Sequence, residues 1–463
     1  MHFVFAAVLL HFLGAGQAQL AGTNTPETGP ALSVQTCTKG GGCKKTSSKV
    51  TLDANWRWLH AANGTNNCYT GQTWDKTLCS DPEKCATSCA LDGADYPGTY
   101  GITSTGDALK MKFITHGPYS VNVGSRVYLM AGDDKYQMFK LKNQEFTFDV
   151  DVSNLPCGLN GALYFAEMAE DGGMKEFPSN KAGAKYGTGY CDAQCPHDVK
   201  FVDGKANLVD WKPSATDINS GTGSVGSCCY EMDIWEANMA AQAFTAHTCK
   251  GLTGPKSCTG AACGDSPANR YGGICDKDGC DYATYRLGNH DFYGPKKTVD
   301  TTKKFTIVTQ FITSDGTANG DLTEIRRLYV QDGRVIKNVH SRFPGLRQFD
   351  SISDKYCAAE KKLFDDKNDF ADKGGLKAMG AAMERGMVLV MSLWDDHTAN
   401  LLWLQSRYPV NKKAFPGVAR GDCDPASGEP KTVEAAHPDA SVEYSNIRFG
   451  DIGSTYGAAA GSE

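Results

Sequence analysis

The sequence lacks the features of a membrane protein and of a nucleic-acid-binding protein. No apolar run is long enough to cross a bilayer, which takes about 20 residues, and no block of basic residues accompanies the net charge of −6. A membrane and a nucleic acid are therefore not expected as partners. Repeats and linker-like segments rich in Ser, Thr and Pro are also missing. We expect residues 19–463 to form a single domain, without a linker or an added binding module, that acts as a monomer.

The first 18 residues have the pattern of a secretory signal peptide. A mostly apolar run, Phe3–Leu13, is followed by small residues up to Ala18, after which cleavage is expected. The mature chain would then be secreted and extracellular. At the other end, a stretch rich in Gly and Ala predicts a short flexible tail after about residue 452.

Eighteen cysteines are present, at close spacings such as Cys191/Cys195. An even number in a secreted protein indicates nine disulfides. C-x3-C pairs can also hold zinc, but the ten histidines do not cluster near them. The segment after Asp276 resembles a calcium loop, yet Leu287 stands where the bidentate Glu belongs. No metal and no cofactor are expected.

Strand patterns dominate the chain. Residues 146–152 alternate apolar and polar side chains, as a half-buried antiparallel strand does. Phe305–Phe311 and Met387–Trp394 are nearly continuous apolar runs, which are typical of strands covered on both faces. Residues 328–336 predict a hairpin with an Asp-Gly turn.

Helix patterns are few, and the best is Leu376–Arg385, which Gly386 would end. The 51 glycines and the long polar stretches between strands indicate large loops. The sequence therefore predicts an all-β sandwich with long loops stapled by disulfides. Long loops in a compact fold usually carry function.

The most informative segment is Glu231-Met-Asp233-Ile-Trp-Glu236, which holds three carboxylates in six residues. Side chains alternate faces along a strand, so Glu231 and Asp233 point the same way. Glu236 joins them only if a β-bulge near Ile234-Trp235 resets the alternation. Crowded carboxylates repel one another and raise one pKa, which leaves a proton donor beside an ionised partner, as glycoside hydrolysis requires. The alternative is an ordinary solvated face, although such a face rarely needs Trp and Met beside its acids.

With these residues in place, the chain resembles glycoside hydrolase family 7, the secreted cellulases, and within it the cellobiohydrolases. The similarity follows the mature sequence in order. The motifs that carry it are Asp53–Trp58, Gly158–Phe165, Gly187–Pro196, Cys228–Asn238, Asn269–Gly273, Ser392–Asp396 and Ser445–Gly450.

The resemblance implies a concanavalin-like β-jelly-roll sandwich whose concave sheet forms a glucan-binding tunnel or cleft. It assigns Glu231 as the nucleophile, Glu236 as the general acid/base, and Asp233 as the carboxyl that orients the nucleophile and tunes its protonation. Hydrolysis of β-1,4-glucosidic bonds would then retain the anomeric configuration, with the two catalytic carboxyls about 5–5.5 Å apart. Cellulose and cello-oligosaccharides are the expected partners.

The tryptophans are the second group that the resemblance marks. Trp56 and Trp58 are two residues apart and are expected to share a strand face. A buried Trp is most often only part of the core. Matched to the sugar-stacking positions of the family, the expected platforms are Trp56, Trp58, Trp394 and Trp403.

Polar residues are assigned to the sugars in the same way. Those expected to bind sugar near the cleavage point are Asn160, Tyr164, Tyr190, Asp192 and Gln194. His247 is expected to contact the sugar on the leaving side, although a lone His is usually structural. The expected grip on the product consists of Arg270, Asp278 and Arg420, each of which would otherwise be an ordinary surface charge.

The resemblance also implies how the cysteines pair. The expected disulfides are Cys37–Cys43, Cys68–Cys89, Cys79–Cys85, Cys157–Cys423, Cys191–Cys229, Cys195–Cys228, Cys249–Cys275, Cys258–Cys263 and Cys280–Cys357. Two of these would pin residues 190–195 against the start of the acidic strand.

The mode of attack depends on the loops. A long segment at 217–227 and the excursion between Cys249 and Cys275 are features of the tunnel enzymes, which release cellobiose from reducing chain ends. Facing tyrosines that close the roof in some relatives are missing, because residues 264–269 contain no Tyr and Thr398 stands opposite. A covered but looser roof is therefore expected. The alternatives are an open-cleft endo-β-1,4-glucanase and, more remotely, a non-catalytic lectin-like glucan-binding protein.

Overall fold

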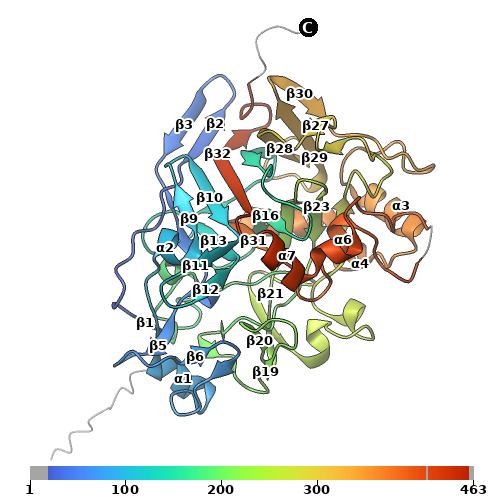
Figure 1. Ribbon diagram of the computed structural model, residues 1–463. Coiled ribbons are helices and arrows are strands. Elements are labelled where there is room, and N and C mark those ends of the chain that lie inside the picture. Colours follow the sequence, from blue (N-terminus) through green and yellow to red (C-terminus); the bar gives the residue numbers. More distant parts are fainter. Residues whose placement is uncertain (1–18, 413–414, 458–463) are drawn as a thin grey trace, which may run out of the picture.

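Two large sheets form the centre of the computed structural model (Figure 1), which describes residues 19–412 and 415–457. The nine-stranded sheet runs β3-β2-β32-β15-β28-β29-β30, with β10 and β9 added beside β32. Its strands are β2 (Val34–Thr38), β3 (Gly42–Thr46), β9 (Ile102–Ser104), β10 (Ala108–Lys112), β15 (Gln144–Asp151), β28 (Phe305–Thr313), β29 (Leu322–Gln331), β30 (Arg334–Lys337) and β32 (Ser441–Asp451). The predicted signal peptide lies outside the described residues.

The eight-stranded sheet runs β25-β23-β22-β16-β31-β13-β4, with β14 beside β31. Its strands are β4 (Lys49–Leu52), β13 (Ser125–Met130), β14 (Met138–Phe139), β16 (Asn160–Ala166), β22 (Glu231–Ala237), β23 (Gln242–His247), β25 (Cys280–Tyr282) and β31 (Met387–Trp394). Neighbouring strands in both sheets are antiparallel except β2 and β32, which pair in parallel and bring early and late parts of the chain together (blue and red in Figure 1).

Short elements surround the two sheets. The helices are α1 (Pro82–Ser88), α2 (Tyr96–Tyr100), α3 (Asp354–Phe364), α4 (Asp369–Asp372), α5 (Gly375–Arg385), α6 (Leu402–Gln405) and α7 (Pro430–Ala436). Small strands include β1 (Leu20–Ala21), β5 (Leu59–Ala61), β8 (Cys89–Leu91), β19 (Lys212–Pro213), β20 (Gly221–Thr222), β21 (Val225–Cys228) and β24 (Lys256–Thr259). Within the described ranges, no helix has both the length and the apolar character that a membrane crossing requires.

Aromatic side chains fill the space between the sheets and make the predicted sandwich. Phe146 and Phe148 of β15 belong to the nine-stranded sheet, and they face Phe165 of β16 and Trp235 of β22 in the other sheet. The ring centroids are 5.0 Å apart for Phe146 and Phe165 and 6.4 Å apart for Phe148 and Trp235. Edge-on packing of this kind adds to the free energy gained by burying the rings. The all-β sandwich expected from the sequence is confirmed.

The end of the described chain covers part of the outer face of β15. Glu145 and Thr147 are fully buried on that face, whereas Asp149 and Asp151 are partly exposed, so the predicted half-buried strand is confirmed except at Thr147. Glu145 accepts hydrogen bonds from the backbone N–H groups of Gly453 (2.7 Å) and Thr455 (2.8 Å). The chain therefore folds back over β15 beyond Ile452, and the flexible tail predicted after about residue 452 does not begin there.

The other local predictions are confirmed. The hairpin between β29 and β30 turns at Asp332 and Gly333, which both have positive φ, as its two-residue turn requires. Helix α5 ends at Arg385, and Gly386 caps it with φ of 115°. Strands β28 and β31 are buried on both faces along nearly all of their length.

All nine disulfides pair as the resemblance implied, and no free cysteine remains among the described residues. Cys157–Cys423 closes the longest loop, with a sequence separation of 266. Cys191–Cys229 and Cys195–Cys228 join the loop at 190–195 to the residues that precede β22. The segment in front of the acidic strand is thus held at two points.

Candidate active site

Strand β22 contains the bulge that the acidic segment requires. On one side, Asp233 pairs with Thr245 and Glu236 with Ala243, so Ile234 and Trp235 oppose a single residue of β23. On the other side, the register with β16 shifts between Leu163 and Phe165. Two residues opposite one is the definition of a β-bulge.

The bulge places the three acids on one face and the apolar residues on the other. Met232, Ile234 and Trp235 are fully buried in the core between the sheets. Glu231 and Asp233 are 7% and 4% exposed on the opposite face, and Glu236 is partly exposed. The prediction of a bulge near Ile234-Trp235 is confirmed, because the core takes two successive side chains there.

Glu231 accepts a hydrogen bond from the backbone N–H of Ala193 at 3.0 Å. Burial, and then the negative charges of Asp233 and Asp192, raise the pKa of Glu231 well above its ordinary value. The Ala193 N–H acts in the opposite direction, because it stabilises the ionised carboxylate. Ala193 lies between Cys191 and Cys195, so the two disulfides of this loop hold the donor in place.

Asp233 lies against His247 of β23, with 3.2 Å between Oδ2 and Nε2. The other ring nitrogen of His247, Nδ1, is 2.8 Å from the carbonyl oxygen of Asp276 and donates to it. Burial lowers the pKa of His247, but the hydrogen bond and charge of Asp233 outweigh burial and raise that pKa to about 9. A cationic imidazole therefore stands beside Asp233 at neutral pH.

Glu236 is held by Asn160 of β16, whose Nδ2 donates to Oε1 at 3.0 Å. The amide oxygen of Asn160 accepts from the backbone N–H of Ala237 at 3.0 Å, which orients the amide. Burial, and then the charge of Asp233, raise the pKa of Glu236 to about 8, while His247 and Asn160 lower it. Glu236 is consequently protonated at neutral pH, as a proton donor must be.

A chain of hydroxyl groups continues from the acids along the same face. Tyr164 and Tyr190 are joined through their hydroxyl oxygens at 2.8 Å, and Tyr190 donates to Asp192. Gln194 donates through Nε2 to the carbonyl of Lys277 at 2.9 Å. The sequence-predicted residues around the cleavage point are thus brought together beside Glu231.

Trp56 and Trp58 do not lie on a strand, which corrects the expectation that they share a strand face. Trp56 ends a short 3-10 helix, η1 (Ala54–Trp56), and Arg57 follows in an extended conformation. The indole N–H of Trp56 faces the carbonyl of Val123, and that of Trp58 donates to Asn67. Both rings are only partly buried, so each keeps an accessible surface.

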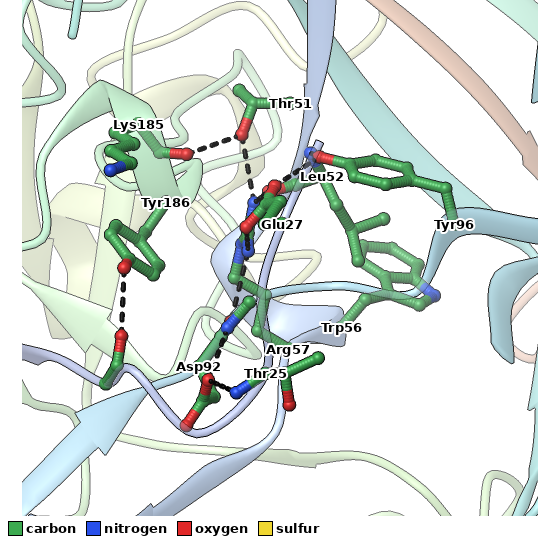
Figure 2. Close-up of polar contacts among 12 residues, drawn as sticks. Thr25, Glu27, Thr51, Leu52, Trp56, Arg57, Asp92, Tyr96, Lys185 and Tyr186 are labelled. Carbon is green, nitrogen blue, oxygen red and sulfur yellow. Dashed lines mark hydrogen bonds and ion pairs between the residues drawn. The ribbon is translucent and has the colours of Figure 1, made fainter. Parts of the chain in front are cut away.

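Arg57, between the two tryptophans, holds this segment to the fold (Figure 2). Its guanidinium binds both carboxylate oxygens of Glu27, at 2.6 and 2.9 Å. It also donates to the carbonyls of Leu52 (3.0 Å) and Asp92 (3.1 Å). Its side chain is completely buried, so the pair with Glu27 is partly shielded from water. Paired bonds of this kind fix both position and orientation.

Trp394 and Trp403 lie next to each other. Their ring centroids are 6.4 Å apart and the planes differ by 26°. Trp394 ends β31, where it pairs with Asn160 of β16. The indole of Trp403 donates to Asp396. The pair therefore borders the end of the sheet where Asn160 binds Glu236.

The three residues expected at the product side come from two places. Arg270 and Asp278 form an ion pair, with Nε donating to Oδ1 at 2.8 Å. Arg420 lies near a buried cluster in which Arg286 binds Glu360 and Asp366, each at 2.8 Å. Burial, and then the nearby charge of Arg286, lower the pKa of Arg420 to about 10.

Two buried arginines, Arg57 and Arg327, and the partly buried Arg126 support this site, and the sequence interpretation missed their role. Arg57 holds the tryptophan segment, as described. Arg126 lies over the ring of Tyr190, 3.3 Å from its centroid, and binds Asp53 at 2.9 Å. Arg327 of β29 crosses the core and donates to the carbonyl of Ile234 in the bulge. A charged residue within an apolar strand, as in Ser125–Met130, is the signal that could have identified Arg126.

Several groups of side chains have the composition of a metal site. Those that contain Cys68, Cys195 or Cys258 consist partly of disulfide sulfurs. In the group Glu231, Asp233 and His247, a ring nitrogen of His247 already binds Asp233. The remaining group, Asp395, His397 and Glu434, lies far from the three acids of β22 in the sequence.

Comparisons with known proteins agree with this geometry. The family model described as glycosyl hydrolase family 7 matches residues 21–456. A crystal structure of a family 7 cellobiohydrolase from Daphnia pulex is similar with a TM-score of 0.93 and 54% identity, over 94% of this chain and 100% of that one. The cellobiohydrolase from Melanocarpus albomyces, complexed with cellotetraose, has a TM-score of 0.89 and 50% identity, over 94% and 99%.

Endoglucanase structures are also similar, at lower identity. An endoglucanase I complexed with cellobiose has a TM-score of 0.78 and 38% identity, over 94% of this chain and 100% of that one. The difference in identity separates the two groups of neighbours.

Proposed function

The chain belongs to glycosyl hydrolase family 7, and on this premise we propose that it is a cellobiohydrolase that releases cellobiose from the reducing ends of cellulose chains. Cellulose hydrolysis is supported by the family and by both groups of neighbours. The cellobiohydrolase neighbours are 50% and 54% identical, against 38% for the endoglucanase I. Attack at the ends of the cellulose chain is the more specific part of the proposal.

The observation that carries the proposal is the bulge in β22, which presents Glu231, Asp233 and Glu236 on one face. Glu236 donates its proton to the glycosidic oxygen while Glu231 attacks the anomeric carbon and forms a glycosyl-enzyme. Glu236, now ionised, takes a proton from water, which releases the sugar with retained configuration. Asp233, beside cationic His247, orients Glu231 and tunes its protonation.

The binding residues follow the sheet on either side of this centre. Sugar rings stack on the accessible indole faces of Trp56, Trp58, Trp394 and Trp403. Hydroxyl groups near the cleavage point bind Asn160, Tyr164, Tyr190, Asp192, Gln194 and His247. Arg270, Asp278 and Arg420 hold the cellobiose product. Secretion after cleavage behind Ala18, and action as a monomer, complete the proposal.

A contact between two loops supports the exo mode. Nδ1 of His397, in the segment after β31, is 3.0 Å from the carbonyl oxygen of Thr216, in the loop between β19 and β20. Gln72 holds the same loop through the carbonyls of Ser214 and Asp217, each at 2.6 Å. We infer that these joined loops form a roof over a bound chain.

One observation favours the runner-up, an endo-β-1,4-glucanase. Thr398 and residues 265–268 are exposed, and none of them is aromatic. A roof whose loop tips are not joined by aromatic side chains opens more easily. The enzyme can then begin hydrolysis in the middle of a cellulose chain. Some endo-initiation is therefore part of the proposal.

The test of the proposal is Glu231→Gln. We expect kcat on an aryl β-cellobioside to fall by more than about 1000-fold, because the nucleophile is lost, while cellobiose binding changes little. Glu443→Gln, a surface glutamate paired with Lys304, is the control and should keep wild-type activity. Unchanged hydrolysis by Glu231→Gln would refute the assignment, and an inert wild-type protein that binds cello-oligosaccharides would favour the lectin-like alternative.

A further inference from the structure

A second group of titratable side chains lies beside the roof. Asp395 follows directly after β31, His397 is two residues further, and Glu434 belongs to α7. One possible ligand atom of each lies within 4.8 Å of the others. Nε2 of His397 is 3.6 Å from Oδ2 of Asp395 and 3.6 Å from Oε1 of Glu434. The ring nitrogen thus faces two carboxylate oxygens at equal distances.

The tautomer of His397 follows from its other contact. Nδ1 lies 3.0 Å from the carbonyl oxygen of Thr216, which can only accept, so Nδ1 carries a hydrogen. The neutral ring then has its lone pair on Nε2, directed at the two carboxylates. Metal-binding histidines typically donate their other ring N–H to a carbonyl or carboxylate in this way.

The distances fit an ion better than direct hydrogen bonds. At 3.6 Å, Nε2 is too far from either oxygen for a good hydrogen bond. A tetrahedral zinc ion with bonds of about 2.0–2.2 Å separates its ligand atoms by about 3.4 Å. The two separations of 3.6 Å at Nε2 are therefore close to those of ligand atoms around such an ion.

Asp395 provides an independent observation. Its side chain is only 5% exposed, and its Oδ2 has no hydrogen-bond partner within the described parts of the chain. A buried carboxylate oxygen without a partner is costly. This same oxygen is the one that faces His397. A cation bound there would remove the cost.

We propose that Asp395, His397 and Glu434 bind a divalent transition-metal ion, for which zinc is the best fit, with water as a further ligand. One imidazole and two carboxylates suit zinc, whereas calcium and magnesium prefer oxygen ligands alone. The ion would tie the segment after β31 to α7, and through His397 to the loop that contains Thr216. It would thereby hold the roof without taking part in the reaction at Glu231.

The test is zinc titration of the chelator-treated full chain by calorimetry. We expect one zinc ion per chain at this site, and we expect His397→Asn to weaken its binding by more than about 100-fold, because loss of even an outer partner costs about 10–100-fold. The Asn amide can still donate to Thr216, so the loop contact is kept. Glu434→Gln should also weaken binding. The control is His340→Asn, since His340 lies 3.8 Å from a single carboxylate, Asp350.

Cobalt binding gives a second readout, visible absorption, which is independent of calorimetry. Co²⁺ bound at this site should show the strong visible absorption of a tetrahedral complex in the wild type and in His340→Asn, and not in His397→Asn. Equal zinc affinity in the wild type and His397→Asn would place the ion elsewhere, for example at Asp233 and His247, and would overturn the proposal. Absence of zinc binding by the wild type would also overturn it.

Discussion

At the scale of single residues, Asn160 lowers the pKa of the proton donor, against the larger opposite effects of burial and Asp233. Its amide donates to Glu236, whose pKa is about 8, and this bond stabilises the ionised form. Glu236 must be protonated to act as the acid, so activity should fall as the pH rises through about 8. The basic limb of the pH profile therefore reports the environment of Glu236.

Asn160→Ala should move that limb to higher pH. Loss of the donor removes a contact worth about 1.5 kcal/mol to the carboxylate, which raises the pKa of Glu236 by about one unit. The measurement is kcat/KM against pH on a soluble cellobioside. Asn154→Ala, whose amide donates to the carbonyl of Asp439 and the hydroxyl of Ser441 and to none of the three acids, should leave the profile unchanged. A limb that stays in place or moves to lower pH in Asn160→Ala would contradict the role given to Asn160.

The alternation of side chains along a strand was enough to predict the bulge. Glu236 can share a face with Glu231 and Asp233 only if the two residues before it, Ile234 and Trp235, both enter the core. The supporting arginines could not be predicted in the same way. Arg327 acts on Ile234 from the other sheet, and the sequence separation of 93 gives no local sign of the contact. Interactions made across the core follow from packing and not from periodicity.

At the scale of elements, the loop at 190–195 determines the environment of Glu231. Cys195–Cys228 joins this loop to the residues before β22, with a sequence separation of 33. The backbone N–H of Ala193, inside the loop, donates to Glu231 at 3.0 Å. The disulfide therefore serves both stability and the ionised state of the nucleophile.

Replacing Cys195 and Cys228 by Ser should affect both properties. Opening a loop of this size lowers the free energy of unfolding by about 3–4 kcal/mol. Displacement of Ala193 should also lower kcat by about tenfold or more. The control is the double replacement at Cys37 and Cys43, a bridge in the β2–β3 hairpin with a separation of 6, which should cost about 2 kcal/mol and leave kcat unchanged.

Denaturant unfolding and steady-state kinetics on the same samples separate the two effects. Equal kcat in both double variants would show that the loop at 190–195 has no role beyond stability. Such an outcome would leave the fold account intact but remove the link between the disulfide and Glu231.

The tryptophan segment shows where element prediction reaches its limit. Residues two apart share a face only on a strand, and Trp56 ends a 3-10 helix. The reason lies in Arg57, whose five donors find Glu27, Leu52, Thr51 and Asp92 and thereby determine the local backbone. The sequence pattern of one strand cannot reveal these partners, because they come from three other segments of the chain.

At the scale of the whole molecule, the loops decide where on the cellulose chain the enzyme acts. The contact between His397 and Thr216 joins two of them, while Thr398 and residues 265–268 stay exposed. We expect most new reducing ends from cellulose to be soluble, with a smaller insoluble fraction from endo-initiation. Quantifying the two fractions over time checks this expectation.

A matched variant sharpens the measurement. His397→Ala removes the hydrogen bond to Thr216 and should raise the insoluble fraction, whereas His340→Ala, an exposed histidine, should not. Mostly insoluble ends from the wild type would contradict the exo mode and favour an endo-β-1,4-glucanase.

The sandwich architecture and the disulfide pairs could be anticipated at this scale because the resemblance extends over nearly the whole mature chain. The burial of Thr455 could not, since a Gly- and Ala-rich end has no pattern that predicts docking. Thr455 is held by Glu145, a charged residue more than 300 positions earlier in the sequence. Only the closed sandwich brings the two together.

The most direct measurement of the central claim is mass spectrometry of the enzyme after reaction with an activated 2-deoxy-2-fluoro-β-cellobioside. Such a substrate slows hydrolysis of the glycosyl-enzyme, so the intermediate accumulates and its attachment site can be mapped by proteolysis. We predict a single adduct on the carboxylate of Glu231, with none in Glu231→Gln. An adduct on Asp233 or Glu236, or turnover without any adduct and with an inverted product, would contradict the roles assigned to the three acids of β22.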